Sequence, residues 1–480
     1  MAAVTFHSFS FSSPLPPVRI LHTADWHLGH RLYDRDRTPE HRAALAWLLD
    51  TIEAEAIDLL VVAGDVFDVT NPSNQARELY YEFLGQLART NCAGAVIVGG
   101  NHDSPSMLDA PKDLLKSLNL HVVGAARTPV QGEVVKIVSR KHPAERLLVA
   151  AVPYLRERDI RKAKFGETSE ERLVGLQEGI RSHYQEVAAA AEALRDDPAT
   201  PIIATGHLFA GGASDHAEKS SYIYQADEHN IEGGQFPAVF DYVALGHIHR
   251  AQRVGGQERI RYCGSLVPLT FVEGQMIRSV RIVELGKAGE PVVSRQLNVP
   301  YFRTLLRLKA GLDEVKQALR NAAVAHQQQP IAEGLNAANQ APEILRSKAR
   351  LNTQEARISL PSSVSPLPGT EGEAFLAPWA EIRITTDEHL PNLRQTLLDT
   401  LAEVTTQPGP KPPIELLRIS QERLSPAPAA APLEKRQLDE LQPEEVFAGI
   451  VAADGYSAER TAELLADFRH LRNWMNDEPA

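Results

Sequence analysis

Side chains able to bind metal ions stand just after the first apolar run of the sequence. Asp25 and His27 follow the run VRILHT and are separated by one residue. Residues two positions apart on an extended chain project to the same side, so this step offers a carboxylate and an imidazole to one cation. One such pair decides little, because Asp and His at strand ends often only cap a turn. The metal-binding interpretation therefore depends on the other runs.

Later apolar runs end in the same types of residue. These ends are Gly64-Asp65-Val66-Phe67-Asp68, Gly99-Gly100-Asn101-His102-Asp103, Gly206-His207 and Gly246-His247-Ile248-His249. A glycine before the polar residue permits a sharp turn or a close approach of two segments. A single Gly-His pair usually marks only a turn, but the repetition of such ends within one domain indicates a site.

The combination of Asp, Asn and His supplies oxygen and nitrogen ligands without thiolates. Such a set suits Mn²⁺, Fe²⁺ or Zn²⁺, and an aspartate placed between two ions can bridge them. A pair of ions lowers the pKa of a bound water and neutralises charge on phosphoryl oxygens. The ligand types thus fit a site for divalent metal ions and leave the identity of the metal open.

The elements that carry these ends alternate between short strands and helices. From Val18 to about Leu285, runs rich in Val, Ile and Leu are separated by segments with helical spacing, such as 40–55 and 74–88. This alternation predicts a layered α/β domain. Ligands of open α/β sheets lie at the carboxyl ends of the strands, so we expect the separate ends to meet in one place.

A smaller α+β unit is predicted over residues 297–424. Strands are expected in YFRTLLRLKA, WAEIRITT and IELLRIS, and helices in LDEVKQALRNA and LPNLRQTLLDTLAEV. An insertion at about 325–376 is rich in Gln, Ala, Pro, Ser and Gly and is expected to be disordered.

The C-terminal part is predicted to be a Pro/Ala linker at 425–435, followed by an amphipathic helix pair at 436–475. The apolar faces of the two helices carry Val446, Phe447, Ile450 and Val451, and Leu464, Leu465, Phe468 and Leu471. These faces either fold back on the chain or dock on a partner, and the linker favours a partner.

Composition limits the classes of function. The 480 residues carry 50 Lys and Arg against 62 Asp and Glu, a formal net charge of -12, so a DNA-coating protein is not indicated, whereas a DNA enzyme is compatible. Cys92 and Cys263 are the only cysteines, which fits a reducing, cytoplasmic compartment.

No apolar run approaches the roughly 20 residues that span a bilayer, so no membrane association is expected. Residues 1–17 lack Lys and Arg and are expected to be a disordered extension, not a secretory signal.

Taken in order, DWHLG, GDVFD, GGNHD, GH and GHIH resemble the signature of calcineurin-like metallophosphoesterases. More closely, ILHTADWHLG, NPSNQARELYYEFL and IVGGNHDSP resemble the family of SbcD nuclease subunits of bacterial SbcC and SbcD complexes. The resemblance covers most of the chain outside the N-terminal extension and the insertion. It implies an α/β sandwich of two mixed sheets flanked by helices over residues 18–290, an α+β capping domain over 297–424, and an ATPase-binding helix pair over 436–475.

The resemblance also implies a role for each motif residue. One metal ion would be held by Asp25, His27 and His249, the other by Asn101, His207 and His247, with Asp65 bridging the two. His102 matches the family's catalytic histidine, which would protonate or stabilise the departing 3'-oxygen of the nucleotide. Asp103 would either orient His102 or cap a turn.

Other residues near the motifs carry weaker signals. Asp68 stands where archaeal and eukaryotic relatives of the family carry a histidine. The role of that histidine is therefore not transferred to this chain. Asp68 remains a candidate for supporting the metal ligands. His30 and His216 fall outside the motif positions and are not expected to bind metal, and Trp26 is expected to pack beneath the site. The basic stretches RLYDRDR and LRERDIRKAKFG are expected to be solvated loops.

The function implied by the resemblance is that of an Mn²⁺-dependent DNA nuclease of repair, recombination and replication. It would act on duplex ends as a 3'-5' exonuclease and on hairpins or single strands as an endonuclease, as a homodimer in a heterotetramer with an SbcC-like coiled-coil ATPase. An alternative is a metallophosphoesterase on a small phosphodiester or phosphoprotein, which would need the same ligands but neither the capping domain nor the helix pair. A noncatalytic scaffold is disfavoured because every ligand position and His102 are present.

Overall fold

The structure is a computed structural model, and the residues that it describes are 17–138, 146–162, 165–211, 231–327, 376–388, 390–404, 413–423, 443–453 and 458–477. The predicted linker at 425–435, His216, residues 1–16 of the predicted extension and residues 328–375 of the predicted insertion lie outside the described residues. The chain forms two compact units.

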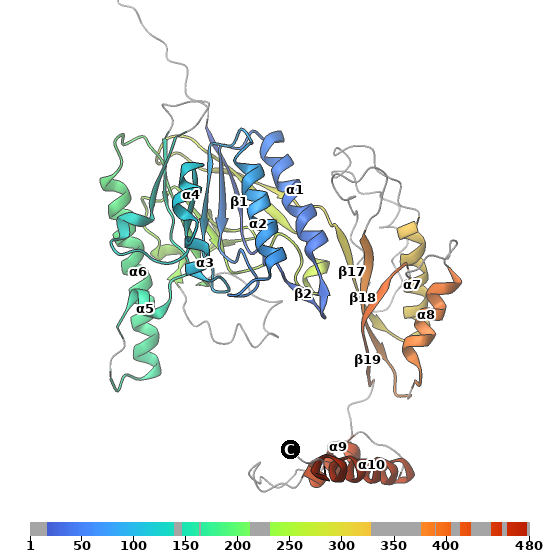
Figure 1. Ribbon diagram of the computed structural model, residues 1–480. Helices are drawn as coiled ribbons and strands as arrows, with labels where there is room; N and C mark the ends of the chain where they lie inside the picture. Colours follow the sequence, from blue (N-terminus) through green and yellow to red (C-terminus); the bar gives the residue numbers. More distant parts are fainter. Residues whose placement is uncertain are drawn as a thin grey trace, which may run out of the picture. The chain divides into compact units, whose positions relative to one another are not determined.

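Two mixed six-stranded sheets form the centre of the first unit (Figure 1). The first sheet has the order β16-β15-β1-β4-β5-β6, with β1 at Val18–Thr23, β4 at Leu59–Ala63, β5 at Gly94–Val98, β6 at Leu120–Val123, β15 at Ser279–Leu285 and β16 at Val293–Asn298. The second has the order β13-β14-β12-β9-β8-β7, with β7 at Val134–Val138, β8 at Arg146–Ala150, β9 at Ile202–His207, β12 at Tyr242–Gly246, β13 at Gln252–Val254 and β14 at Gln257–Tyr262. Because β16 pairs antiparallel with β15, the first sheet continues past the boundary at residue 290 that the sequence suggested.

Shorter elements connect these strands. The helices are α1 at Thr38–Ala54, α2 at Asn74–Leu87, α3 at Pro105–Asp109, α4 at Lys112–Ser117, α5 at Glu157–Ile160 and α6 at Ser169–Ala193. Two-residue strands are β2 at Arg31–Leu32, β3 at Arg35–Asp36, β10 at Ala210–Gly211 and β11 at Ile231–Glu232, and single 3₁₀ turns occupy Val130–Glu133, Gly233–Gln235 and Glu273–Gln275. Local capping explains where two of the helices begin. The Ser73 hydroxyl accepts from the Ala76 N–H at the start of α2, and Thr168 forms a capping box with Glu171 before α6.

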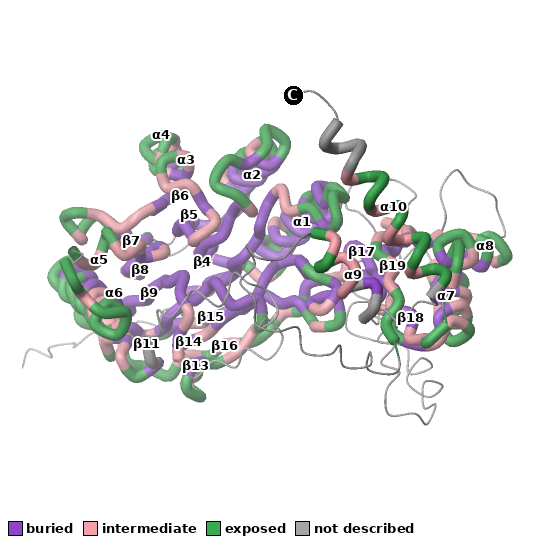
Figure 2. Tube along the Cα trace, turned by 90° about the horizontal axis from the view of Figure 1, so that it is seen from below, coloured by how far each residue is buried: buried purple, intermediate pink, exposed green. Residues whose placement is uncertain are grey.

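Separate apolar cores fill the spaces between the layers of this unit. Val61 of the first sheet and Ile203 of the second belong to the apolar core between the two sheets. Leu48 of α1 and Phe83 of α2 pack on the outer face of the first sheet, and Tyr184 of α6 packs on the outer face of the second. Figure 2 shows the central strands of the two sheets, such as β4 and β9, as buried along their length. The order helix, sheet, sheet, helix confirms the predicted layered α/β sandwich.

The smaller α+β part consists of a three-stranded sheet with two helices on one side (Figure 1). The strands are β17 at Arg303–Ala310, β18 at Leu376–Thr385 and β19 at Glu415–Glu422, in that order in the sheet, and the helices are α7 at Leu312–Gln327 and α8 at Leu393–Glu403. Leu319 of α7 and Leu397 of α8 are fully buried, as the apolar spacing of the sequence predicts.

The C-terminal helices are α9 at Pro443–Ala453 and α10 at Ala458–Asp477, and they pack on each other. Their contact includes stacked rings of Phe447 and Phe468, whose centroids are 4.3 Å apart at an interplanar angle of 9°. Among the described residues, no helix is both long enough and apolar enough to cross a membrane.

Candidate metal centre

Parallel pairing brings the predicted ligand segments to one edge of the sandwich. In the first sheet β1 pairs in parallel with β4, and β4 with β5. In the second sheet β12 pairs in parallel with β9, where Gly246 is opposite His207. The carboxyl ends of these strands therefore point in the same direction within each sheet, which is where ligands bind in open α/β sheets.

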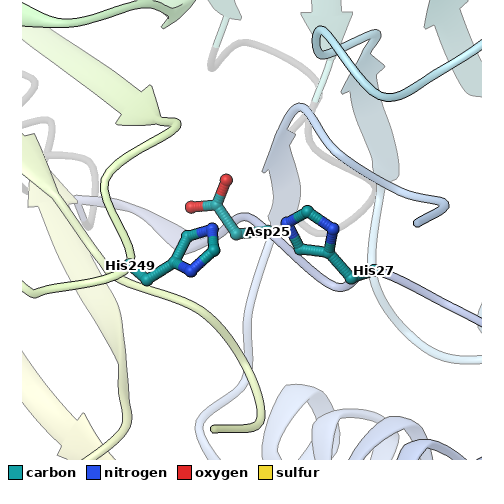
Figure 3. A group of neighbouring side chains, drawn as sticks. All are labelled: Asp25, His27 and His249. Carbon is teal, nitrogen blue, oxygen red and sulfur yellow. The ribbon is translucent and has the colours of Figure 1, made fainter. Parts of the chain in front are cut away.

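Asp25, His27 and His249 form one group of potential ligands. Their carboxylate oxygen and ring nitrogens all lie within 4.8 Å of one another, and all of these side chains are buried. Figure 3 shows Asp25 between His27 and His249, with its carboxylate on the side of His249. The loop after β1 thus meets the loop after β12, although the two are far apart in the sequence.

Asp65 lies at the centre of the cluster. Its Oδ2 is 3.2 Å from Nε2 of His207 and 3.6 Å from Nε2 of His27, so it faces potential ligands from both sheets. Asp65 also shares a group with Asp25 and His207 in which one ligand atom of each lies within 4.8 Å of the others. A carboxylate in this position is suited to bridging two cations.

Asn101 joins His207 and His247 in a further group. The amide oxygen of Asn101 is 3.0 Å from Nε2 of His207 and 3.1 Å from Nδ1 of His247. The structure therefore brings together all of the side chains that the sequence suggested as ligands: Asp25, His27, Asp65, Asn101, His207, His247 and His249.

The cluster has the chemical character of a metal site. Oδ2 of Asp25 and Nε2 of His27 are buried and have no hydrogen-bond partner among the described residues. A buried carboxylate oxygen without a partner is costly, and a cation would satisfy it. Oxygen and nitrogen donors without thiolates suit divalent ions such as Mn²⁺, Fe²⁺ or Zn²⁺. The residues present therefore fit one or more divalent metal ions.

The backbone is strained at several of these positions. Asp25, His27, Asp65 and His247 have φ angles of 52°, 47°, 48° and 95°. Residues other than glycine seldom adopt positive φ, and each such residue costs on the order of 1–3 kcal/mol. The surrounding structure holds these residues in a conformation that turns their side chains toward the shared edge.

Glycines leave room for the ligands. A Cβ atom on Gly64, whose φ is 90°, would lie 2.1 Å from Nδ1 of His207, and one on Gly100 would lie 2.1 Å from Oδ1 of Asp65. Neither distance is tolerable, so both positions require glycine. The expectation that glycines before the polar residues serve close approach is confirmed here.

Asp103 organises backbone and does not orient His102. Its carboxylate accepts hydrogen bonds from the backbone N–H groups of Val66 at 3.0 Å, Phe67 at 2.9 Å and Gly100 at 2.9 Å. It therefore fastens the loop after β4 to the loop after β5. The sequence left two roles open for Asp103, orienting His102 or capping a turn, and the structure supports the capping role.

His102 is oriented by the backbone of Asp68. Its Nδ1 donates to the Asp68 carbonyl at 2.7 Å, and its own N–H donates to Oδ1 of Asp65 at 2.9 Å. The ring is half-buried, and one of its nitrogens lies within 4.8 Å of ligand atoms of His27 and Asp65. Since a carbonyl fixes the proton on Nδ1, Nε2 is the atom left for chemistry.

The Asp68 carboxylate lies between two histidines. Its Oδ1 is 3.2 Å from Nδ1 of His27 and 3.0 Å from Nδ1 of His30. Burial alone would raise the pKa of Asp68, but the adjacent imidazoles of His27 and His30 hold that pKa below its usual range. His30, which was not expected to bind metal, belongs to no group of potential ligands among the described residues.

Trp26 packs beneath the site, as expected. It is fully buried, its ring meets that of Phe83 edge-on at 5.2 Å, and its Nε1 donates to the Thr23 hydroxyl at 3.0 Å. The residue between Asp25 and His27 thus anchors the loop in the apolar core.

Asp65 and His207 stabilise each other's charges. Burial alone would raise the pKa of Asp65, but the adjacent imidazole of His207 lowers that pKa below its usual range. Burial would lower the pKa of His207, but the Asp65 carboxylate raises it to about 9. A metal ion competes with a proton for this imidazole, so metal binding should release protons.

Glu273 is a site residue that sequence motifs did not reveal. It follows a long apolar loop, is 5% exposed, and places Oε1 3.2 Å from Nδ1 of His249. The only sequence signal is an acidic residue within the otherwise apolar segment LVPLTFVEG. That signal does not predict which histidine the carboxylate contacts.

Comparisons with known proteins agree with this architecture. Residues 18–251 match the calcineurin-like phosphoesterase family, and residues 343–454 match the family described as Type 5 capsule protein repressor C-terminal domain.

The SbcD subunit of the nuclease SbcCD from Escherichia coli (strain K12) is 34% identical over 431 residues, which cover 90% of this chain and 92% of the relative. The SbcD subunit from Bacillus subtilis (strain 168) is 34% identical over 306 residues, 62% of this chain and 74% of the relative. Among solved structures, a dimetal phosphatase from Danio rerio aligns with 58% of this chain and 99% of its own at a TM-score of 0.32 and 11% identity, too distant to inform the site.

Replacing Asp25 tests whether the cluster binds metal. An ion present at 100 times its Kd stabilises a folded protein by about 2.7 kcal/mol. We expect Mn²⁺ to raise the thermal unfolding midpoint of the chelator-treated chain, and Asp25→Asn to lose most of that increase. Asp50→Asn, at an exposed position of α1, is the matched control and should respond like the unchanged chain. Equal stabilisation of all three proteins would contradict the assignment.

Proposed function

Because the chain belongs to the family of SbcD subunits of SbcCD nucleases, we propose that it is a metal-dependent nuclease that hydrolyses DNA phosphodiester bonds and acts with an SbcC-type ATPase. The observation that carries this proposal is the cluster of buried Asp and His side chains with Asn101 at the common edge of the two sheets. The proposal implies duplex ends and hairpins as substrates, and repair and recombination in the bacterial cytoplasm as the setting.

Two divalent ions, with Mn²⁺ as the preferred metal, are proposed for this cluster. The ligand sets are Asp25, His27 and His249 for one ion, and Asn101, His207 and His247 for the other, with Asp65 shared. Support comes from the position of Asp65, which faces imidazoles of both sets. When bound, such ions supply an activated water and neutralise phosphoryl charge.

His102 is proposed as the catalytic residue. The Asp68 carbonyl holds Nδ1, so the ring cannot rotate freely and presents Nε2 beside the cluster. From that position it can donate a proton to, or hydrogen-bond, the departing 3'-oxygen of the nucleotide. Asp103 supports this arrangement by holding the loops that carry Asp65 and Asn101 against each other.

Substitution of His102 tests the proposed activity. General acid catalysis contributes roughly 10²- to 10⁴-fold, so His102→Ala should slow cleavage of a labelled hairpin duplex in Mn²⁺ by about that factor. The rate should be measured for the purified chain, with and without a co-expressed SbcC-like ATPase. His121→Ala, a partly buried histidine of β6, is the control and should cleave normally.

Two results would count against the nuclease proposal. Normal cleavage by His102→Ala would remove that residue from the mechanism. A folded, metal-loaded chain that leaves DNA intact in either setting, but hydrolyses a small phosphodiester or a phosphoprotein, would establish the alternative substrate class.

The helix pair α9 and α10 is proposed to bind the coiled coil of the ATPase. The stacked rings of Phe447 and Phe468 hold the helices together, while Val446 and Leu471 remain 43% and 52% exposed. Exposed apolar side chains on an amphipathic helix are suited to packing against another helix. We further propose that helices of the phosphoesterase domain join two copies of the chain into a dimer within the complex.

A charge on the exposed face of α10 tests the partner contact. Leu471→Asp should reduce co-purification with the SbcC-like ATPase, because an aspartate in an apolar helix contact is costly to bury. Val293→Asp, on strand β16 at 62% exposure, is the control outside the helices and should leave co-purification unchanged. Unchanged binding by Leu471→Asp would place the contact elsewhere.

A further inference from the structure

The carboxylate of Glu273 is buried against His249. Glu273 is 5% exposed and stands at the start of a 3₁₀ turn, Glu273–Gln275, in the loop that leads from β14 to β15. Its Oε1 lies 3.2 Å from Nδ1 of His249, and its Oε2 accepts from the Leu269 N–H at 3.0 Å and the Ser265 hydroxyl at 3.3 Å. Both carboxylate oxygens are therefore engaged.

Arg278 completes the surroundings of this carboxylate. It is 3% exposed, and its Nη1 lies 3.3 Å from Oε2 of Glu273. The same nitrogen donates to the His249 carbonyl at 2.7 Å and to the Ser265 hydroxyl at 2.9 Å. Glu273 and Arg278 form an ion pair in which Glu273 contacts the imidazole of His249 and Arg278 binds its carbonyl. The positive charge of Arg278 compensates the buried negative charge of Glu273.

The contact with Glu273 decides which nitrogen of His249 can bind a metal. A carboxylate accepts hydrogen bonds, so Nδ1 must carry the proton, and the lone pair is then on Nε2. A carboxylate behind an imidazole also makes the other nitrogen a stronger ligand. His27, in the same ligand set, has the Asp68 carboxylate 3.2 Å from its Nδ1, whereas Nδ1 of His207 instead donates to the Ala63 carbonyl at 2.9 Å.

We propose that Glu273 is a positioning residue for metal binding: it fixes His249 in the Nδ1-protonated form and strengthens Nε2 as a ligand of the ion that Asp25 and His27 also hold. This inference rests on the metal centre of the proposed function. Its effect should be largest at that ion, because Glu273 contacts His249 directly, whereas the other ligands, His207 and His247, hydrogen-bond to the amide oxygen of Asn101.

Titration with Mn²⁺ alone tests the proposal. Removing a carboxylate of this kind usually costs about 10- to 100-fold in metal affinity. By calorimetry on the chelator-treated full chain, Glu273→Gln should weaken one of two binding events by about that factor and the other by less. Glu178→Gln, at an exposed position of α6, is the matched control.

A double-variant comparison separates positioning from general support of the loop. If Glu273 acts through His249, then Glu273→Gln should weaken Mn²⁺ binding no further in a His249→Ala background. An additional loss in that background, or full affinity in Glu273→Gln alone, would overturn the proposal. An unchanged chain that binds no Mn²⁺ would instead refute the metal centre itself, so the two failures are distinguishable.

The protonation of His249 can also be read without altering Glu273. In a histidine-labelled, metal-free chain, ¹⁵N NMR should show the Nδ1-protonated form for the resonance that disappears in His249→Ala. The Nε2-protonated form for that resonance would contradict the inference even if Glu273→Gln failed to fold.

Discussion

The Asp65 carboxylate is buried between imidazoles that come from both sheets, and the architecture around it serves to hold these charged groups together. A buried carboxylate is stable only with positive charge or hydrogen-bond donors beside it. The imidazole of His207 and the backbone N–H of His102 supply part of this compensation. The cation that the cluster fits would supply the remainder, which ties folding of this edge to metal binding.

Holding this cluster requires conformations that an ordinary sheet edge avoids. Asp25, His27 and Asp65 all have positive φ, and Gly64 and Gly100 leave no space for a Cβ atom. Buried carboxylates compensate for the strain by binding backbone: Asp103 holds the turns after β4 and β5, and Glu273 holds the loop near Leu269. Acidic side chains outside the ligand sets thus hold the loops that carry the ligands.

Much of the fold could be predicted from the sequence because its signals are local. Apolar runs such as 59–63 and 94–98 became buried strands, and the spacing in 74–88 became α2. Motif order also placed every candidate ligand at a strand end, and parallel pairing brought those ends to one edge.

The features that escaped prediction depend on contacts between distant segments. The contact between Glu273 and His249 joins residues without a shared motif, and the role of Asp103 stayed open because its partners are backbone N–H groups. Strand β16 extends the first sheet only through its pairing with β15, so the boundary near residue 290 could not be placed from local composition. Helix α6 was not predicted, although the Thr168 and Glu171 capping box marks its start.

We propose that two metal ions share Asp65 at the edge where the sheets meet. Anomalous X-ray scattering from crystals of the full chain soaked in Mn²⁺, collected on both sides of the manganese absorption edge, tests this most directly. We expect two manganese peaks in this cluster, one beside Asp25, His27 and His249 and one beside Asn101, His207 and His247, with Asp65 between them. A single peak, or peaks away from these side chains, would contradict it.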